Sequence, residues 1–295
     1  MSQLKKKITK AVFPVAGLGT RFLPVTKATA KEMLPIVDKP LVQFAVEEAI
    51  NAGITNMIFV TGRTKRAIED HFDKAYELET ELELRGKQQL LEVARDVIPS
   101  HINCIYVRQA EALGLGHAVL CARPVVDHES FAVVLADDLI DSKPGALKEM
   151  VDVYEREECS VIAVENVAPD ETSSYGIVDC GDASGNVRPI NAIVEKPDPS
   201  VAPSTLAVVG RYLLMPEIFA ELETIPRGAG GEIQLTDAIA SLLCKHRALA
   251  FAFSGTRYDC GSKLGYLQAN VRLGMRHSEI GAEFREFLKT VRPDK

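Results

Sequence analysis

Short apolar segments alternate with amphipathic segments over the first 160 residues, and this alternation constrains the fold more than any other feature. Segments that are apolar throughout are typical of strands in parallel or mixed sheets that are covered on both faces. The pattern predicts strands at 8–15, 57–61, 102–108 and 131–135, with helices at 41–52, 65–76, 77–96 and 116–122.

Beyond about residue 160 the predicted strands are joined by shorter connections. Residues 182–186, Asp-Ala-Ser-Gly-Asn, are typical of a hairpin turn. Strands are expected at 161–166, 175–180, 190–195 and 206–213, and helices at 232–245, 263–277 and 282–291. The fold class is therefore α/β, with a mixed, mainly parallel sheet and a smaller mixed lobe.

Composition excludes several classes of protein. The chain has 295 residues, of which 46% are hydrophobic, so it can bury a sizeable core. No stretch approaches the ~18 apolar residues of a membrane span, and the first residues lack the apolar core of a secretory signal. The 34 basic and 41 acidic residues give a net charge of −7, which argues against a nucleic-acid partner. Six cysteines without a Cys-x-x-Cys spacing favour a reduced, cytoplasmic protein without structural zinc.

A glycine-rich loop, Val-Ala-Gly-Leu-Gly-Thr-Arg at 15–21, follows the first predicted strand. Glycines allow backbone amides to approach a phosphate closely, and Thr20 and Arg21 add side-chain donors. A tight turn that needs positive φ is the structural alternative. The loop lacks the Gly-Lys-Ser/Thr end of a Walker A motif. Phe22 stands where a dinucleotide-binding fingerprint has its third glycine, which disfavours a nicotinamide-dependent oxidoreductase.

The residues after this loop are predicted to follow an extended path. Prolines at 24, 35 and 40 exclude a regular helix, so the chain can return Lys31 toward the glycine loop. Farther along, Asp137 follows an apolar strand at its carboxyl end, where open α/β sheets place ligands.

Read together, these stretches and six further motifs resemble the sugar-phosphate nucleotidyltransferases. The resemblance covers residues 9–274, and the order of its motifs makes it specific. Its one small departure is Ala30, where a proline is expected before the lysine. The further motifs are VRQAEALGLGHA at 107–118, LADD at 135–138, SYGIV at 174–178, VEKP at 194–197, GEIQLTD at 231–237 and YDCG at 258–261.

The resemblance implies the Rossmann-like fold of the nucleotide-diphospho-sugar transferases. It is closest to members that transfer a uridylyl group from UTP to glucose 1-phosphate and release pyrophosphate. The attacking sugar phosphate is already an anion, so such an enzyme needs cations, amides and a metal rather than a general base.

The resemblance assigns a role to each candidate residue. Arg21, Lys31 and Lys196 would be the catalytic cations. Asp137 and Asp259 would hold Mg²⁺, with Asp138 as a second choice, although a helix N-cap or turn is its alternative role. The nucleotide-binding residues would be Ala16, Gly17, Leu18, Gly19, Thr20, Arg21, Lys31, Gln109 and Gly114, of which Gln109 and Gly114 read the uracil. The sugar-phosphate residues would be Tyr175, Gly176, Glu195, Lys196 and Glu232.

The resemblance also implies one nucleotidyltransferase domain over 1–295 and a homo-oligomer, either a dimer or a tetramer. Residues 8–160 would bind the nucleotide, 161–262 would bind the sugar phosphate, and 263–295 would form C-terminal helices. A glucose-1-phosphate thymidylyltransferase is the nearest alternative, because thymine differs from uracil by one methyl group. A non-catalytic relative that binds nucleotide sugars is disfavoured, because the three cations and both aspartates are present.

Overall fold

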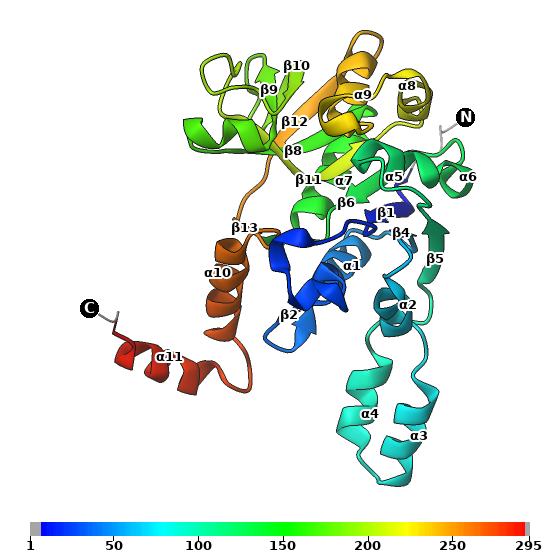
Figure 1. Ribbon diagram of the computed structural model, residues 1–295, viewed down its shortest axis with the longest axis vertical. Helices are drawn as coiled ribbons and strands as arrows, with labels where there is room; N and C mark the ends of the chain where they lie inside the picture. Colours follow the sequence, from blue (N-terminus) through cyan, green and yellow to red (C-terminus); the bar gives the residue numbers. More distant parts are fainter. Residues whose placement is uncertain (1–6, 293–295) are drawn as a thin grey trace.

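The computed structural model describes residues 7–292, which are built around one nine-stranded sheet (Figure 1). In order across the sheet, the strands are β5 (Asn103–Arg108), β4 (Asn56–Thr61), β1 (Lys10–Pro14), β6 (Phe131–Val134), β11 (Leu206–Leu214), β8 (Ser160–Asn166), β12 (Ala248–Ala252), β10 (Val187–Glu195) and β9 (Gly176–Cys180). Two further pairs lie outside it, β7 (Asp138–Asp141) with β13 (Thr256–Asp259), and β2 (Pro35–Ile36) with β3 (Lys39–Pro40).

The first half of the sheet is parallel. Strands β5, β4, β1 and β6 all run in one direction, and Ala11 of β1 is in register with Met57 on one side and Ala132 on the other. Because parallel strands end at the same edge, the glycine-rich loop, Gln109 and the residues that follow β6 are brought to one side of the sheet. These four strands confirm the predicted ones to within two residues at each end.

The second half of the sheet is mixed. Strand β11 is antiparallel to both β6 and β8, whereas β12 runs parallel to β8. Strands β9 and β10 form the hairpin that the turn at 182–186 predicts. The mixed sheet is confirmed, but its parallel character is concentrated in the first half. Strand β12 was not predicted, because alanine occupies three of its five positions and has little intrinsic preference for strands.

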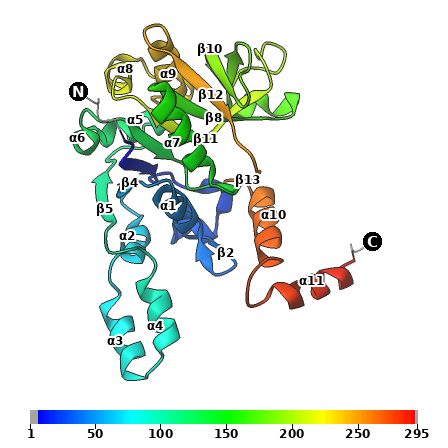
Figure 2. The ribbon, with the colours of Figure 1, turned by 180° about the vertical axis from the view of Figure 1, so that it is seen from behind.

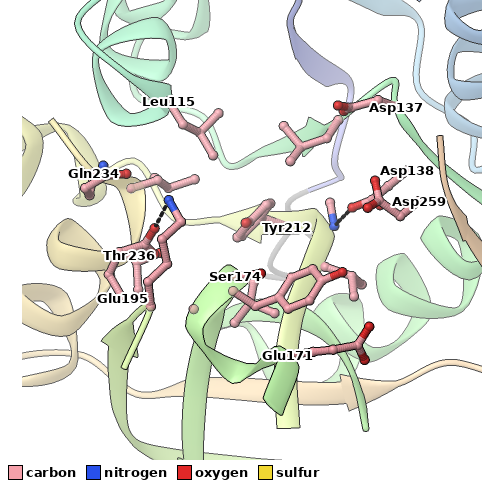
Figure 3. A pocket seen from close by; sticks show the side chains of 18 of the residues that line it. Leu115, Asp137, Asp138, Glu171, Ser174, Glu195, Tyr212, Gln234, Thr236 and Asp259 are labelled. Atoms are coloured by element: carbon pink, nitrogen blue, oxygen red, sulfur yellow. Dashed lines mark hydrogen bonds and ion pairs between the residues drawn. The ribbon is translucent and has the colours of Figure 1, made fainter. Parts of the chain in front are cut away.

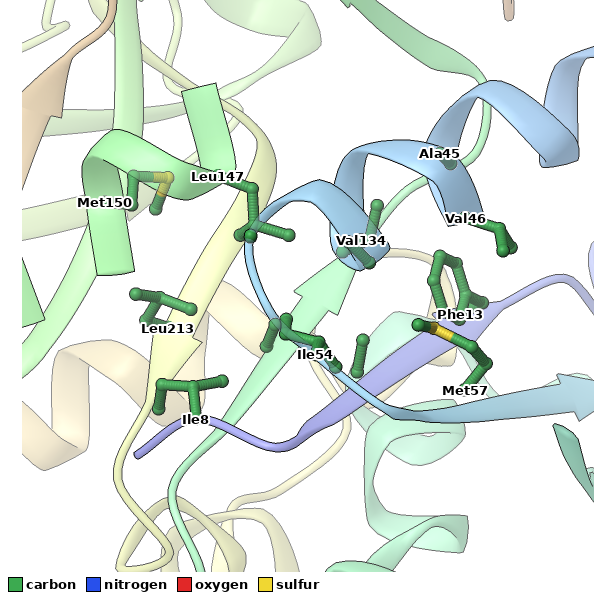
Figure 4. Close-up of a cluster of buried hydrophobic side chains, with 14 of the residues drawn as sticks. Ile8, Phe13, Ala45, Val46, Ile54, Met57, Val134, Leu147, Met150 and Leu213 are labelled. Carbon is green, nitrogen blue, oxygen red and sulfur yellow. The ribbon is translucent and has the colours of Figure 1, made fainter. Parts of the chain in front are cut away.

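Helices cover both faces of the sheet. Helices α1 (Leu41–Asn51) and α7 (Ala146–Glu157) pack on the face that includes Phe13, as Figure 4 shows. The opposite face, which includes Val12, is covered by α5 (Leu115–Cys121), α8 (Ile218–Thr224) and α9 (Leu235–Leu243). Burial on both faces is the physical reason why the central strands, such as β1 and β6, are almost entirely apolar. Helices α7 and α8 were not predicted from the sequence.

The prediction of one long helix over 77–96 is wrong. The segment forms two helices, α3 (Tyr76–Leu84) and α4 (Gln88–Arg95), separated by Gly86 with φ +66°. This left-handed conformation suits glycine and ends a helix, so the chain turns back on itself. An ion pair of 2.9 Å between Arg95 Nε and Glu79 Oε2 joins the two helices. They form an arm that projects from the body of the molecule below α2 (Arg66–Phe72).

Beyond the sheet, the chain ends in α10 (Lys263–Gly274) and α11 (Gly281–Thr290), and α11 projects away from the sheet in both views (Figures 1 and 2). After the glycine-rich loop, the chain forms the short 3-10 turns η1 (Thr20–Phe22), η2 (Val25–Lys27) and η3 (Lys31–Met33) instead of a regular helix. None of the helices within residues 7–292 is long and apolar enough to cross a membrane. The remaining short helices are α6 (Arg123–Val126), η4 (Pro169–Ser174) and η5 (Ala229–Gly231).

Candidate active site

A cleft of about 550 Å³ opens where the segment after β6 faces β11, the β9–β10 hairpin and the start of α9 (Figure 3). Eight of the predicted site residues line this cleft, and they come from both halves of the sheet. They are Arg21, Asp137, Tyr175, Gly176, Glu195, Lys196, Glu232 and Asp259. The glycine loop at 16–20, Lys31, Gln109 and Gly114 do not line the cleft itself.

Two carboxylates converge on one small space in the cleft. A methyl group at Gly261 would lie 2.9 Å from Asp137 Oδ2 and 3.0 Å from Asp259 Oδ1, so this space is open because residue 261 has no side chain. Proteins usually hold Mg²⁺ through one or two carboxylates, and substrate phosphates and water complete its shell. Among residues 7–292, no group of three or more His, Cys, Asp or Glu side chains could hold a metal. The two aspartates therefore fit a magnesium ion that shares its ligands with a phosphate.

Lys31 lies directly beside this space, paired with one of its carboxylates. Its Nζ is 2.5 Å from Asp137 Oδ2. Burial alone would lower the Lys31 pKa, but the Asp137 and Glu32 carboxylates outweigh it and hold that pKa above its ordinary value. Burial would likewise raise the Asp137 pKa, but Lys31 outweighs it and holds that pKa below its ordinary value. Lys31 is therefore already ion-paired with Asp137 and is not a free cation.

A second ion pair fixes the segment that carries Lys31. Glu32 Oε2 accepts from Lys65 Nζ at 2.9 Å, and the side chains are 2% and 4% exposed. Burial raises the pKa of Glu32, and the neighbouring Lys65 and Lys31 oppose this. Because breaking so buried a pair is costly, η3 is held firmly against the start of α2.

The glycine-rich loop combines a tight turn with an open face. Gly19 adopts φ 67°, and its carbonyl accepts from Thr26 Oγ1 at 2.8 Å, so the turn expected as the alternative is present at this position. A methyl group at Gly17 would meet nothing within 4 Å, and the Leu18 side chain is 74% exposed. Beyond the loop, Arg21 Nη1 donates to Gly261 O at 3.4 Å, so its guanidinium borders the same space as the two aspartates.

Residues of the β9–β10 hairpin form the opposite wall. Gly176 and Glu195 are paired across the hairpin, and a methyl group at Gly176 would lie 3.4 Å from Glu195 Oε2. Lys196 follows Glu195 in a left-handed backbone conformation, and its Nζ lies 3.0 Å from Glu195 Oε1. Figure 3 shows Glu195 and Thr236 on one side of the cleft, with Asp137, Asp138 and Asp259 on the other. The predicted metal site and the predicted sugar-phosphate site thus face each other across the cleft.

Gln109 and Gly114 lie next to this wall. Gln109 Nε2 donates to Gly114 O at 3.2 Å, and its backbone N–H donates to Thr61 O at the end of β4. Gly114 has φ +97°, and a methyl group there would lie 2.7 Å from the Cβ of Glu232. The structure therefore brings Gln109, Gly114 and Glu232 together, although only Glu232 lines the cleft.

Sequence reasoning missed Arg257, which organises the floor of the cleft. Its Nη2 lies 2.6 Å from Asp138 Oδ1, its Nη1 lies 2.6 Å from Glu165 Oε1, and its guanidinium is 5.2 Å from the centre of the Tyr175 ring. The other Asp138 oxygen accepts from the backbone N–H of Gly210 at 2.7 Å. Burial raises the pKa of Asp138, opposed by Arg257.

The protein engages both carboxylate oxygens of Asp138, which leaves neither open to a metal. Its alternative role in a turn matches the structure, because its backbone N–H donates to Leu135 O at 3.3 Å. It begins β7 and is 7% exposed. Arg257 directly precedes the YDCG motif, so its position gave the one available signal. Of the other lining residues, Ser174, Gln234 and Thr236 lie within the SYGIV and GEIQLTD motifs but were not singled out, whereas Glu171 and Tyr212 lie outside every motif.

The fold and the cleft together define a nucleotide-dependent group transferase. A parallel sheet edge carries a glycine-rich loop, and the cleft beside it contains two facing carboxylates, cations and a polar wall. The family model for nucleotidyl transferases matches residues 10–275. The chain belongs to the nucleotidyl transferase family, as the sequence motifs predict.

Within that family, the chain is similar to bacterial UTP–glucose-1-phosphate uridylyltransferases. The enzyme of that name from Haemophilus influenzae is 50% identical over 290 residues, covering 96% of this chain and 98% of that protein. A solved structure of UTP-bound UGPase from Acinetobacter baumannii has a TM-score of 0.90 at 44% identity, with 97% of this chain and 100% of that one covered. A UDP-glucose pyrophosphorylase complexed with UDP-glucose has a TM-score of 0.85 at 46% identity, with coverages of 92% and 100%.

Proposed function

We propose that the protein transfers a uridylyl group from UTP to α-D-glucose 1-phosphate, giving UDP-glucose and pyrophosphate. The observation that carries this proposal is the convergence of eight predicted site residues, from two halves of the sheet, on one cleft of about 550 Å³. The named activity of relatives that are about half identical over nearly the whole chain supports the choice of uridine and glucose.

In this reaction, an oxygen of the sugar phosphate forms a bond to the α-phosphorus of UTP. The bond between that phosphorus and the oxygen bridging to the β-phosphorus breaks, and pyrophosphate leaves with the electron pair. Arg21 and Lys31 neutralise the triphosphate, and the amides of residues 16–20 bind its oxygens at the open face of the loop. No proton has to be removed from the attacking oxygen, so the chain needs no general base.

Asp137 and Asp259 would hold Mg²⁺ in the space beside Gly261. When bound there, the ion would neutralise charge on the phosphates and fix their geometry. Lys31 is paired with Asp137, so its ammonium lies beside the place where the triphosphate would meet the ion. In this proposal, Asp137, Asp259 and Lys31 together form the part of the site that would bind the ion and the triphosphate.

The β9–β10 hairpin would bind the sugar phosphate. Glu195 accepts hydrogen bonds from sugar hydroxyls, and the exposed ammonium of Lys196 binds the phosphate. Tyr175 and Gly176 complete the pocket beside the hairpin, and Glu232 lines it from the segment before α9. The polar wall faces the aspartates across the cleft, which suits an attacking phosphate held opposite the triphosphate.

A panel of nucleoside triphosphates against sugar 1-phosphates, followed by pyrophosphate release, tests the proposal. UTP with glucose 1-phosphate is expected to give the highest kcat/KM. A higher value with dTTP would make the protein a thymidylyltransferase, and nucleotide-sugar binding without pyrophosphate release would make it a non-catalytic relative. Either result contradicts the proposed reaction.

We also propose a cytoplasmic location and a homo-oligomer. All six cysteines are free thiols, which supports a reducing compartment. Helix α10 presents Leu264, Leu267 and Val271, with exposed fractions of 67%, 59% and 37%. Their spacing of three and four residues places them on one helix face, and a second copy of the chain would cover it.

A further inference from the structure

The side-chain amide of Gln109 has a fixed orientation. The residue is 8% exposed, and its Nε2 lies 3.2 Å from Gly114 O and 3.0 Å from His117 Nδ1. A backbone carbonyl can only accept a hydrogen bond, so the atom facing Gly114 O must be the amide nitrogen. Its two N–H groups therefore point to Gly114 and His117, and the carbonyl oxygen Oε1 points away from both.

His117 is the second partner that maintains this orientation. Because the amide nitrogen donates, Nδ1 of His117 must accept, and the proton of the neutral ring lies on Nε2. That Nε2 lies 3.9 Å from Sγ of Cys121, one turn farther along α5. Burial raises the pKa of Cys121, so its sulfur stays a neutral thiol that can accept from Nε2. The imidazole is thus held between the thiol and the amide.

The remaining polar atom of Gln109, Oε1, is an open acceptor. No residue among 7–292 donates a hydrogen bond to it, and it is not sealed in the interior either. Within the same residues, the only fully buried side-chain nitrogen or oxygen without a partner is Ser142 Oγ. Oε1 is therefore not sealed off from solvent, and it belongs to a residue that contacts Gly114, whose neighbour Glu232 lines the cleft.

We propose that His117 is a positioning residue. It determines that Gln109 presents a hydrogen-bond acceptor, and not a donor, to the nucleotide base. By accepting from Gln109, it keeps Oε1 turned outward as an acceptor. An acceptor in that place favours a base whose ring nitrogen carries a proton, as in uracil or thymine. It disfavours cytosine, whose corresponding nitrogen is itself an acceptor. This inference rests on the proposed function, in which Gln109 contacts the base.

The test compares the binding of UTP and CTP by calorimetry, without glucose 1-phosphate, in the wild type and two variants. His117→Leu removes one of the two acceptors and leaves Gly114 O alone to hold the amide of Gln109, so Oε1 is held less firmly and the preference for UTP is expected to fall about tenfold. His117→Asn offers an amide oxygen close to the place of Nδ1 and is expected to keep most of the preference. Inorganic pyrophosphate has no base and should bind equally to all three proteins.

The matched control is His128→Leu, because His128 is 92% exposed and should leave the preference unchanged. Thermal unfolding checks that each variant is folded, and His117→Ala replaces the leucine variant if that one is not. The proposal is overturned if the wild type binds UTP and CTP equally, if His117→Leu keeps the full preference, or if His117→Asn loses as much as His117→Leu. Absence of turnover with glucose 1-phosphate, alongside the expected binding pattern, would contradict the proposed reaction alone.

Discussion

At the scale of single residues, Asp137 has one side-chain partner and also faces an open space. Its Oδ2 is paired with Lys31, and the same atom faces the space that it shares with Asp259. A divalent cation in that space would attract the carboxylate more strongly than one ammonium does. The pair with Lys31 therefore holds Asp137 at the edge of the space in which a metal would bind.

Removal of Asp137 or of the metal should abolish most turnover. Asp137→Ala is expected to lower kcat by about a hundredfold or more, because the metal supplies several kcal/mol of charge stabilisation. Excess chelator should have a similar effect on the wild type, and added Mg²⁺ should restore it. Asp70→Ala is the control, since Asp70 is 63% exposed and lies on α2. Full pyrophosphate release in chelator would exclude this role for the aspartates.

The Lys31–Asp137 pair also predicts a pH dependence of stability. The folded pKa of Asp137 lies below the unfolded value of 3.8, so its contribution is present above that pH and is lost as pH falls through the folded value. The folded pKa of Lys31 lies above 10.5, so its contribution is lost only as pH rises through that raised value.

Lys31→Met should therefore lower the free energy of unfolding by about 2 kcal/mol near pH 7, because a charged hydrogen bond is lost. The difference from the wild type should shrink as pH falls through the lowered folded pKa of Asp137, because below that pH the carboxyl is protonated in the wild type as well. Urea unfolding at a series of pH values measures it. A difference that does not change with pH would show that the ion pair contributes little to the free energy of unfolding.

Lys196 is expected to act on the sugar phosphate alone. Its side chain is 48% exposed on the hairpin wall, across the cleft from the aspartates. Lys196→Ala should raise the KM for glucose 1-phosphate about tenfold or more, through loss of a charged contact, and leave the KM for UTP nearly unchanged. Lys148→Ala, on α7, serves as the control. Equal increases in both KM values would remove Lys196 from its assigned role.

At the scale of elements, Glu48 connects its own helix, α1, to helix α7 and strand β11. Its Oε2 accepts from Arg211 Nη2 at 2.7 Å, and its Oε1 accepts from the backbone N–H of Leu147 at 3.0 Å. Arg211, which is 1% exposed, also donates to Leu135 O and Asp138 O. One buried ion pair thus fixes α1 and the start of α7 to β11, directly behind the cleft.

Glu48→Ala should lower the free energy of unfolding by about 3–5 kcal/mol, because it leaves the Arg211 charge buried without its partner. Urea unfolding measures the loss, and the double variant Glu48→Leu with Arg211→Met should recover much of it. Glu47→Ala removes a neighbouring, half-exposed pair with Lys39 and should cost at most about 1 kcal/mol. Similar losses in the two alanine variants would argue against a special role for the buried pair.

At the scale of the whole molecule, the exposed leucines of α10 predict self-association. Leu267→Glu places a charge in the middle of this apolar face and should reduce the mass in solution toward that of one chain, 32.2 kDa. Light scattering after size-exclusion chromatography measures the mass. Gln268→Glu adds the same charge one position away and should leave the assembly intact. A wild-type protein that is already monomeric would rule out the proposed oligomer.

The sequence by itself determined where the first strands lie along the chain and which segments contain the candidate site residues. Strands β1, β4, β5 and β6 follow from local runs of apolar residues, and the glycine loop, Asp137 and Glu195 follow from short motifs. These features depend on neighbours within a few residues, which a linear pattern contains. The same locality explains the error at 77–96, where leucine spacing predicted one helix and a single Gly86 ended it.

Only the tertiary structure decided which groups meet. Arg257 pairs with Asp138, 119 positions away in the chain, and Arg211 pairs with Glu48, 163 positions away. The open space between Asp137 and Asp259 depends on how β7 and β13 pair. Such contacts are selected by the packing of the whole chain, because the energy of a buried charge depends on every element that excludes water from it. A local sequence pattern identifies the candidate residues, and the fold determines which of them are bonded, buried or open to a ligand.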